Sequence, residues 1–195
     1  MRFGHIAGDR MLDLLNTVGW RLAGTDRQER IGDFDDLVDW CAESGVVSGE
    51  EAAELRRLAA HDSASAAHET ALVLALRESA YAALVDQDPG AGLALGRAGA
   101  DAMAAAALVR DRDGWAWHDP DVDLGVPRRR IARGLVDLLR HDDLDRLHQC
   151  EDARCGWVYL DTSPRRNRRW CDAKDCGDRN RARAYYARKK SRAAV

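Results

Sequence analysis

The sequence has few aromatic residues and no long apolar run, and these two absences are the first limits on the class of protein. Aromatic side chains make up 6% of the 195 residues, whereas alanine is abundant. No stretch approaches about 18 uncharged apolar residues, so we expect no membrane-spanning helix. The beginning of the chain has neither an apolar core nor a small-residue cleavage site. We therefore expect no secretion signal and a cytoplasmic protein.

The signatures of common enzyme sites are also missing. The chain contains no P-loop, no Rossmann glycine pattern, no nucleophile elbow and no HExxH motif. Its six histidines are scattered along the sequence and do not form a local group. We therefore expect that the protein is not an enzyme.

Charge is distributed unevenly along the chain, which the net value of −3 conceals. Residues 164–195 contain 12 lysines and arginines against 3 aspartates, a net charge of +9. Residues 1–163 contain 18 basic and 30 acidic residues, a net charge of −12. A basic tail on an acidic body favours contact with phosphate groups, although a solvated tail is an alternative.

Apolar spacing before residue 145 predicts a mainly helical fold with a small β-hairpin. Asp33 suits the N-cap of one helix, and Ser48 with Glu51 forms a capping box for the next. The stretches ALV and WAW flank RDRDG, which predicts a hairpin with a charged turn over residues 107–117. The expected helices cover residues 10–21, 34–44, 49–60, 66–85, 92–107 and 127–140.

A group of polar residues lies on the first expected helix. Asp13, Asn16 and Thr17 fall within about one helical turn, and Arg21 lies about one turn further along. Such a group can line a pocket for a small-molecule effector. Helix capping, exposed polar positions and a buried hydrogen-bond network are the alternatives.

Four of the five cysteines fall in one short window with the spacing C-x4-C-x15-C-x4-C. Two close pairs joined by a longer connector suit the tetrahedral thiolate coordination of zinc, and a reducing cytoplasm favours metal over disulfides. We expect one structural zinc ion per chain. The alternatives are four unrelated cysteines, a ligand from His141 or His148, and a redox-active zinc site. The expected ligands are Cys150, Cys155, Cys171 and Cys176.

The residues around these cysteines predict a hairpin followed by a helix. Residues 156–161 are β-prone, residues 163–167 suit a turn, and the chain returns through residues 168–170 to the third cysteine. The sequence after Gly177 is strongly compatible with a helix. The order of knuckle, hairpin, knuckle and helix is typical of a treble-clef zinc finger, with the last ligand at the N-terminus of the helix.

Basic side chains surround the second cysteine pair and continue along the expected C-terminal helix. Arginine outnumbers lysine here, which suits phosphate groups and guanine edges. Tyr185 and Tyr186 interrupt the charge. We predict a nucleic-acid-binding surface, and docking onto the acidic body of the same chain is the alternative. The predicted binding residues are Arg165, Arg166, Arg168, Arg169, Arg179, Arg181, Arg183, Arg188, Lys189 and Lys190.

The run CGWVYLDTSPRRNRRWCDAKDCGDR resembles the CGNR zinc fingers of bacteria. Their hallmarks are a CGW-hydrophobic-hydrophobic-D-x-S stretch, an arginine-rich turn ending in RWC, and then CGNR. Asp178 stands where the family motif has asparagine, and an aspartate can still cap the following helix. The N-terminal part resembles the ABATE domain that accompanies this finger. The matching pieces are Leu12-Asp13-Leu14-Leu15-Asn16-Thr17, the stretch from Asp36 and Leu37 to Trp40, and Leu76-Arg77-Glu78.

The resemblance implies a stress-related transcription regulator with a DNA-binding finger and a helical domain that senses a ligand or dimerises. We accordingly expect a helical ABATE-like domain over residues 1–145 and a CGNR-type zinc finger over residues 146–195. The expected partners are DNA in preference to RNA, a small-molecule effector and a second copy of the chain, with no membrane. The expected location is the cytoplasm, at the nucleoid if DNA is bound. A zinc-stabilised protein-interaction module and an RNA-binding factor are the alternatives.

Overall fold

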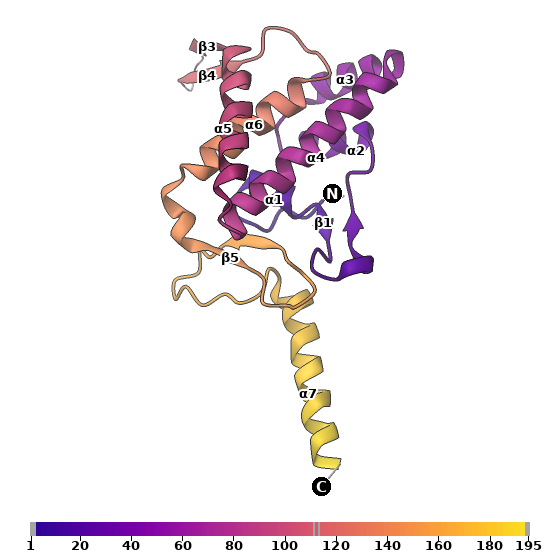
Figure 1. The fold of residues 1–195 in the computed structure, drawn as a ribbon, viewed down its shortest axis with the longest axis vertical. Coiled ribbons are helices and arrows are strands. Elements are labelled where there is room, and N and C mark those ends of the chain that lie inside the picture. The colour runs from indigo at the N-terminus through magenta and orange to yellow at the C-terminus, as the bar shows by residue number, and fades with distance from the viewer. Residues whose placement is uncertain (1–2, 111, 113, 194–195) are drawn as a thin grey trace. The chain divides into compact units, whose positions relative to one another are not determined.

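The computed structural model describes residues 3–110, 112 and 114–193. Its contacts divide the chain into two compact units that alternate along the sequence. Unit 1 consists of Met1–Gly4 and Arg30–Asp142, and unit 2 consists of His5–Glu29 and Asp143–Val195. Residues 5–29 therefore belong to the same unit as the cysteine-rich segment. The expected division at residue 145 instead assigns these residues to the first domain. Figure 1 shows the elements of both units.

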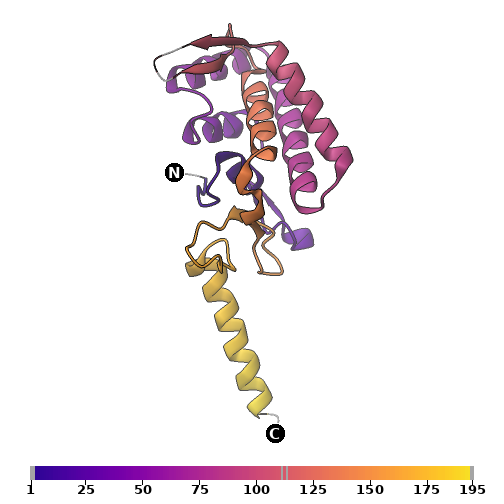
Figure 2. The same ribbon diagram turned by 90° about the vertical axis from the view of Figure 1, so that its left-hand side faces the viewer.

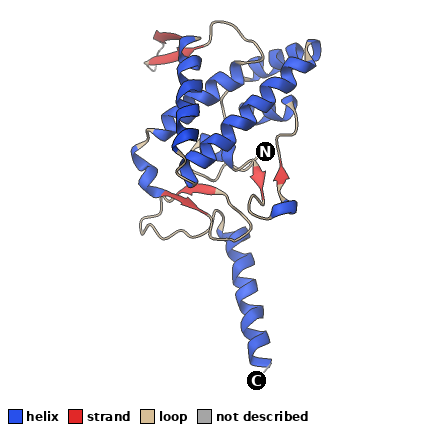
Figure 3. Ribbon diagram, viewed as in Figure 1, coloured by secondary structure: helices blue, strands red, loops and turns tan. Residues whose placement is uncertain are grey.

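Unit 1 is a bundle of helices whose ends follow the signals in the sequence. Asp33 accepts a hydrogen bond from the backbone N of Asp36, and Ser48 and Glu51 form the predicted capping box. Gly45 stops the first of these helices with a φ of 71°. The mainly helical fold with small hairpins is confirmed (Figure 3). The helices are α2 (Phe34–Glu43), α3 (Gly49–His61), α4 (Ser63–Val85), α5 (Pro89–Ala104) and α6 (Val126–Leu139).

The core of unit 1 lies around α4, which contacts α2, α3, α5 and α6. In Figure 2, α4, α5 and α6 run side by side. Gly99 lets α5 approach α6 closely, because a Cβ atom there would lie 2.4 Å from Cγ2 of Val136. Each fully buried aliphatic side chain contributes about 1.5–3 kcal/mol of transfer free energy. The buried set includes Leu37, Trp40, Leu55, Val73, Ala80, Leu95, Ile131 and Leu135.

A buried carboxylate joins the start of α6 to the bundle. Asp119 accepts hydrogen bonds from Arg133 (2.6 Å), Arg130 (3.0 Å) and Arg129 (3.1 Å). Arg130 also pairs with Glu51 of the capping box, at 2.7 Å. Burial alone would raise the pKa of Asp119, but the three guanidinium groups outweigh burial and lower that pKa to about 2.

The predicted hairpin is present in unit 1 as β3 (Ala107–Arg110) and β4 (Trp115–His118), paired antiparallel. Asp111 and Asp113 of its charged turn lie outside the described residues. The preceding helix begins and ends earlier than expected, at Pro89 and Ala104, because Pro89 occupies the first turn and Asp88 caps it.

Unit 2 has short elements and one long helix. The first predicted helix is shorter than expected: α1 covers Arg10–Leu15 only, and the chain then enters a short strand pair, β1 (Val18–Gly19) with β2 (Gln28–Glu29). The strand β6 (Val158–Leu160) pairs with β5 (Leu147–Gln149). The predicted pairing of residues 156–161 with residues 168–170 is therefore wrong.

The C-terminal part of unit 2 is helical, as predicted. A π-helical turn over Ala173–Gly177 leads into α7 (Asp178–Ala193). The treble-clef assignment stays a prediction. Among the helices in the described part of the chain, none is both long enough and apolar enough to cross a lipid bilayer.

We predict that Asp119→Asn lowers the free energy of unfolding by about 3 kcal/mol, because it leaves three arginines around a neutral side chain. Urea denaturation followed by far-UV circular dichroism measures this loss. Because folding lowers the pKa of Asp119, its stabilisation is present above its unfolded pKa of about 4 and is lost as pH falls towards 2. The variant should therefore depend less on pH in this window. Asp121→Asn, at an exposed neighbour, is the matched control, and equal stability of the two variants would contradict the prediction.

Candidate metal centre and basic surface

Four cysteine sulfurs in unit 2 lie within 4.8 Å of one another, and all four residues are buried. The Sγ atoms of Cys155 and Cys171 are 3.6 Å apart, and those of Cys171 and Cys176 are 3.5 Å apart. Tetrahedral zinc with bonds of 2.3 Å places its sulfurs about 3.8 Å apart, so the cluster fits this ion. Neither His141 nor His148 belongs to the cluster. The predicted cysteines are thus positioned to hold one structural zinc ion.

The first cysteine pair is held by the hairpin of β5 and β6. Cys150 follows β5, and its backbone N donates to the carbonyl of Trp157 at 2.8 Å. Cys155 donates from its backbone N to Asp152 at 2.9 Å, which closes the turn. Gly156 has a φ of 72°, and a Cβ atom there would lie 2.9 Å from Cβ of Arg21. Glycine is therefore required at this position.

The second cysteine pair is held by the π-helical turn before α7. The Asp172 side chain accepts hydrogen bonds from the backbone N of Lys174 (2.6 Å) and Asp175 (3.2 Å). The backbone N of Gly177 donates a hydrogen bond to the carbonyl of Asp172 at 3.0 Å. Cys176 therefore sits at the N-terminal end of a long helix, where the helix dipole favours a thiolate.

The close packing of the four thiols gives them different pKa values. Hydrogen bonds from Cys155 and Cys171 lower the pKa of Cys150, whereas the hydrogen bond to Cys150 raises the pKa of Cys171. The pKa of Cys150 therefore lies well below that of Cys171. A divalent cation would let all four act as thiolates, and its binding would release protons.

Asp152, inside the first cysteine pair, connects that pair to α7. Its side chain is fully buried and accepts hydrogen bonds from Asn180 (2.7 Å), Arg183 (3.2 Å) and Arg179 (3.4 Å), all on α7. The backbone N of Arg154 adds a fourth bond at 3.0 Å. Burial acts to raise the pKa of Asp152, and these donors together lower it. The helix is thus fixed to the first knuckle by one carboxylate.

Arg179 lies at the centre of this arrangement. Its Nη2 atom is 3.1 Å from Sγ of Cys176, so it donates to a ligand sulfur and supports the thiolate form. Its guanidinium also lies over the ring of Trp20, at 4.2 Å from the centroid. An ion pair with Asp175, at 2.9 Å, completes its contacts. This arginine, predicted to bind nucleic acid, is therefore occupied inside unit 2.

The N-terminal segment of unit 2 supports the hairpin that carries the first cysteine pair. The Asn16 side chain donates to the carbonyl of Val158 (2.8 Å) and accepts from its backbone N (2.9 Å). The backbone N of Leu160 donates to Ala7 at 2.8 Å, and the indole of Trp157 donates to Val18 at 2.8 Å. No local pattern in the sequence indicates this role, because the partners lie more than a hundred residues apart.

The other three residues predicted for an effector pocket are also engaged in hydrogen bonds. Asp13 accepts from the backbone N of Ile6 and of Ala7, both at 3.0 Å. Thr17 donates to Leu14 at 2.7 Å, and Arg21 donates to Leu15 at 3.0 Å. The alternative of a buried hydrogen-bond network describes these side chains, and a pocket at them stays a prediction.

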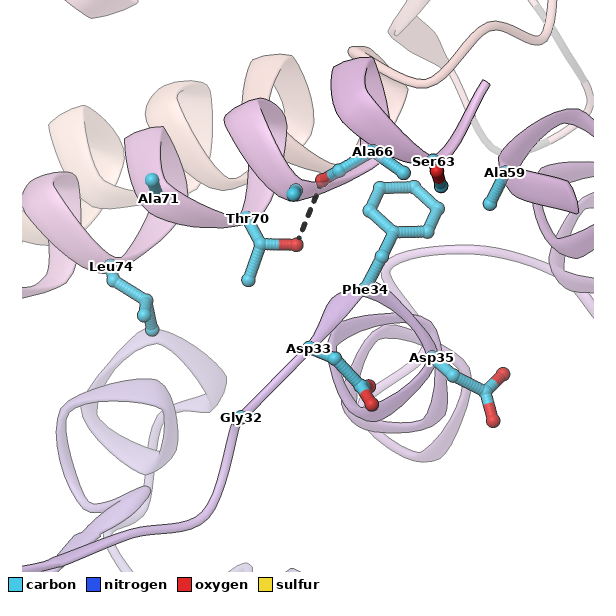
Figure 4. A pocket seen from close by; sticks show the side chains of 11 residues that line it. Gly32, Asp33, Phe34, Asp35, Ala59, Ser63, Ala66, Thr70, Ala71 and Leu74 are labelled. Carbon is cyan, nitrogen blue, oxygen red and sulfur yellow. Dashed lines mark hydrogen bonds between the residues drawn. The ribbon is translucent and has the colours of Figure 1, made fainter. Parts of the chain in front are cut away.

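A cavity of about 420 Å³ lies elsewhere, in unit 1, between the start of α2, the end of α3 and the first half of α4. Figure 4 shows Phe34 and Leu74 at this cavity, with Thr70 bonded to the carbonyl of Ala66 at 3.0 Å. None of the four residues predicted for the effector pocket lines it. Its wall is mostly small and apolar: Gly32, Asp33, Phe34, Asp35, Ala59, Ser63, Ala66, Ala67, Thr70, Ala71 and Leu74.

The predicted nucleic-acid residues fall into an internal group and an exposed group. Arg168 is internal: its guanidinium lies 4.0 Å from the ring centroid of Tyr159 and donates to the carbonyls of Trp170 and Cys171. Arg179 is half-buried and Arg183 is exposed, and both are held by Asp152. Three exposed arginines have an acidic partner nearby: Arg166 with Asp145, Arg169 with Glu151, and Arg181 with Asp178.

Four predicted residues remain exposed and form no ion pair within the described part of the chain: Arg165, Arg188, Lys189 and Lys190. Three of them lie on α7, whose side chains are exposed throughout residues 181–192. Tyr185 and Tyr186 are exposed there too, with their rings in edge-to-face contact at 5.5 Å. Figure 1 shows α7 projecting from the rest of unit 2.

The fold and the cysteine cluster define a zinc-finger protein with an additional helical unit. The family model "CGNR zinc finger" matches residues 146–189, and the model "ABATE: Putative stress-induced transcription regulator" matches residues 8–142. Because the second match covers more than half of the chain, the chain belongs to the ABATE family and carries a CGNR zinc finger. The predicted resemblance is confirmed. No curated protein matches the chain.

We predict about one zinc ion per chain in the purified, reduced protein, and a value near zero for Cys171→Ser, because the tetrahedral site needs all four sulfurs. Elemental analysis by mass spectrometry measures the metal content. Cys41→Ala is the matched control, because Cys41 is buried in unit 1 and is not one of the four clustered cysteines. A full complement of zinc in Cys171→Ser would contradict the assignment.

We predict that Asn16→Ala weakens the zinc site although Asn16 is not a ligand. The substitution leaves the backbone N and carbonyl of Val158 buried without partners, at a cost of about 1–3 kcal/mol each. Zinc should therefore pass to a colorimetric chelator roughly tenfold faster or more than in the wild type. Asn167→Ala, at an exposed position, should behave like the wild type. Equal transfer rates for Asn16→Ala and the wild type would show that residues 5–29 do not support the site.

Proposed function

We propose that this protein is a transcription regulator that binds double-stranded DNA through its zinc finger, with α7 as the principal contact element. The observation that carries the proposal is a basic helix that is exposed on all sides over residues 181–192. Its N-terminal end is fixed to Asp152, which lies within the first cysteine pair. Membership of a family described as a transcription regulator supports the same conclusion.

The charge of α7 supports binding to phosphate. Arg188, Lys189 and Lys190 form no ion pair within the described residues, so their charges are available to a partner. A groove of B-form DNA about 12 Å wide accepts one α-helix, which matches a helix without neighbours on its exposed part. Arg165, in the turn before the second cysteine pair, is a further free charge in the same unit.

The isolation of α7 supports a partner of this kind. A helix that is polar on every side gains no stability from packing, and a single helix of 16 residues is marginal in water. Asp152 orients its first turns, and the zinc cluster holds Asp152 in place. The remaining turns would gain stability by neutralising phosphates. Tyr185 and Tyr186 would add contacts to the sugar-phosphate backbone.

For unit 1 we propose a regulatory role, by sensing a small-molecule effector or by dimerisation. The apolar cavity at the start of α2 supports the first alternative, since small-molecule sites are concave and mostly apolar. We propose no catalytic step for this chain. We propose that the protein acts in the cytoplasm, at the nucleoid.

The test is fluorescence anisotropy with a random-sequence DNA duplex and zinc-loaded protein, over a series of salt concentrations. We predict that Arg188→Ala/Lys190→Ala lowers the affinity about tenfold or more at about 0.1 M salt and reduces the salt slope by about 2, because two phosphate contacts are lost. The matched control is Arg97→Ala/Arg140→Ala, which removes two exposed charges from unit 1.

Unchanged affinity in the α7 double variant, or an equal loss in the control, would overturn the proposed interface. Competition between structured RNA and duplex DNA supplies the second arm of the test. Preference for the duplex supports the proposal, whereas preference for RNA would replace it with an RNA-binding function.

A further inference from the structure

The β3–β4 hairpin of unit 1 presents tryptophan side chains to solvent. Trp115 is 68% exposed and Trp117 is 43% exposed, and Leu108 on the neighbouring strand is 51% exposed. In a protein with few aromatic residues, two exposed indoles two positions apart are unusual. Large exposed apolar side chains that gather in one place mark an interaction site more often than scattered ones do.

The strand register places these side chains on one face of the hairpin. Leu108 lies opposite Trp117, and Arg110 lies opposite Trp115. Because side chains alternate along a strand, Trp115 and Trp117 share this face, whereas Ala116 and its partner Val109 point to the other. The apolar stripe thus follows β4 along its length.

The hairpin has free edges as well as a free face. Its sheet contains two strands only within the described residues, and every residue of both strands is exposed. Two strands alone are at best marginally stable in water, and a third or fourth strand is the usual means of stabilising them. The two edges differ: β3 ends in Arg110, whereas β4 reads WAWH, with no lysine, arginine, proline or acidic residue to block pairing.

We propose that β4 is a dimerisation edge, which pairs antiparallel with β4 of a second copy of this chain across a two-fold axis. A second copy fits because the edge is complementary to itself. With Ala116 opposite its own equivalent on the axis, each Trp115 lies opposite Trp117 of the other copy, and no charged side chains face each other. The two hairpins then form one four-stranded sheet with two aromatic cross-strand pairs.

The exposed area indicates how strong this dimer is. With about 200 Å² for a whole aromatic side chain, the two indoles leave roughly 200 Å² of apolar surface exposed on each copy. Stable interfaces bury about 800 Å² per partner, so the indoles of β4 support only a weak, reversible dimer. This inference makes specific the dimerisation that is proposed for unit 1. It does not depend on DNA binding, because oligomeric state is measured without nucleic acid.

Sedimentation equilibrium of the zinc-loaded full chain, from about 5 to 200 µM, tests the pairing. We predict reversible dimerisation of the wild type and monomers for Ala116→Arg, because two guanidinium groups would meet at the axis. Ala116→Glu alone should also be monomeric. A mixture of Ala116→Arg with Ala116→Glu should restore the dimer, because opposite charges then face each other. Circular dichroism checks that both variants keep the fold, which the exposed position of Ala116 favours.

The matched control is Leu93→Arg, which places the same charge at an exposed apolar residue of α5. This variant should dimerise like the wild type. A monomeric wild type over the whole range would overturn the inference. Dimerisation of Ala116→Arg would also overturn it, and so would failure of the mixed variants to associate. Either result would show that the side chains at position 116 do not meet at the axis.

Discussion

Four sulfurs held within 4.8 Å of one another inside a protein repel each other when all four are thiolates. A divalent cation at their centre would neutralise this repulsion, and the contacts that place α7 are built around that site. The cluster fixes the two cysteine pairs, the first pair places Asp152, and Asp152 binds three side chains of α7. Metal coordination therefore sets the direction of the basic helix α7 indirectly, through Asp152.

The same module divides its arginines between structure and surface. Arg168 and Arg179 satisfy carbonyls, a ligand sulfur and aromatic rings, while the free charges lie towards the end of α7 and at Arg165. An internal arginine close to a ligand thiolate stabilises the negative charge of that thiolate, so its own charge is used within the protein. The exposed ones remain free to meet phosphate. One residue type thus does two kinds of work within the last third of the chain.

The sequence predicts correctly those features that depend on residues close together in the chain. Cysteine spacing gave the zinc cluster, and Asp33, Ser48 and Glu51 gave the helix starts of α2 and α3. The errors occur where distant residues compete. The first helix ends early because the side chain of Asn16 bonds to Val158, and β6 pairs with β5 because the Asp152 turn joins them closely. An aspartate between two cysteines of a basic module was the one signal that could have indicated the internal role of Arg179.

The interleaving of the units has a consequence for how the chain is made. Residues 5–29 are synthesised before the hairpin that they support, and all four metal ligands lie beyond residue 142. A nascent chain that stops before the last cysteine pair lacks two of the four ligands and cannot complete the zinc site. Zinc can therefore bind at this site only after the chain has been synthesised past Cys176. A zinc-finger fragment without residues 5–29 lacks the segment that supports its hairpin.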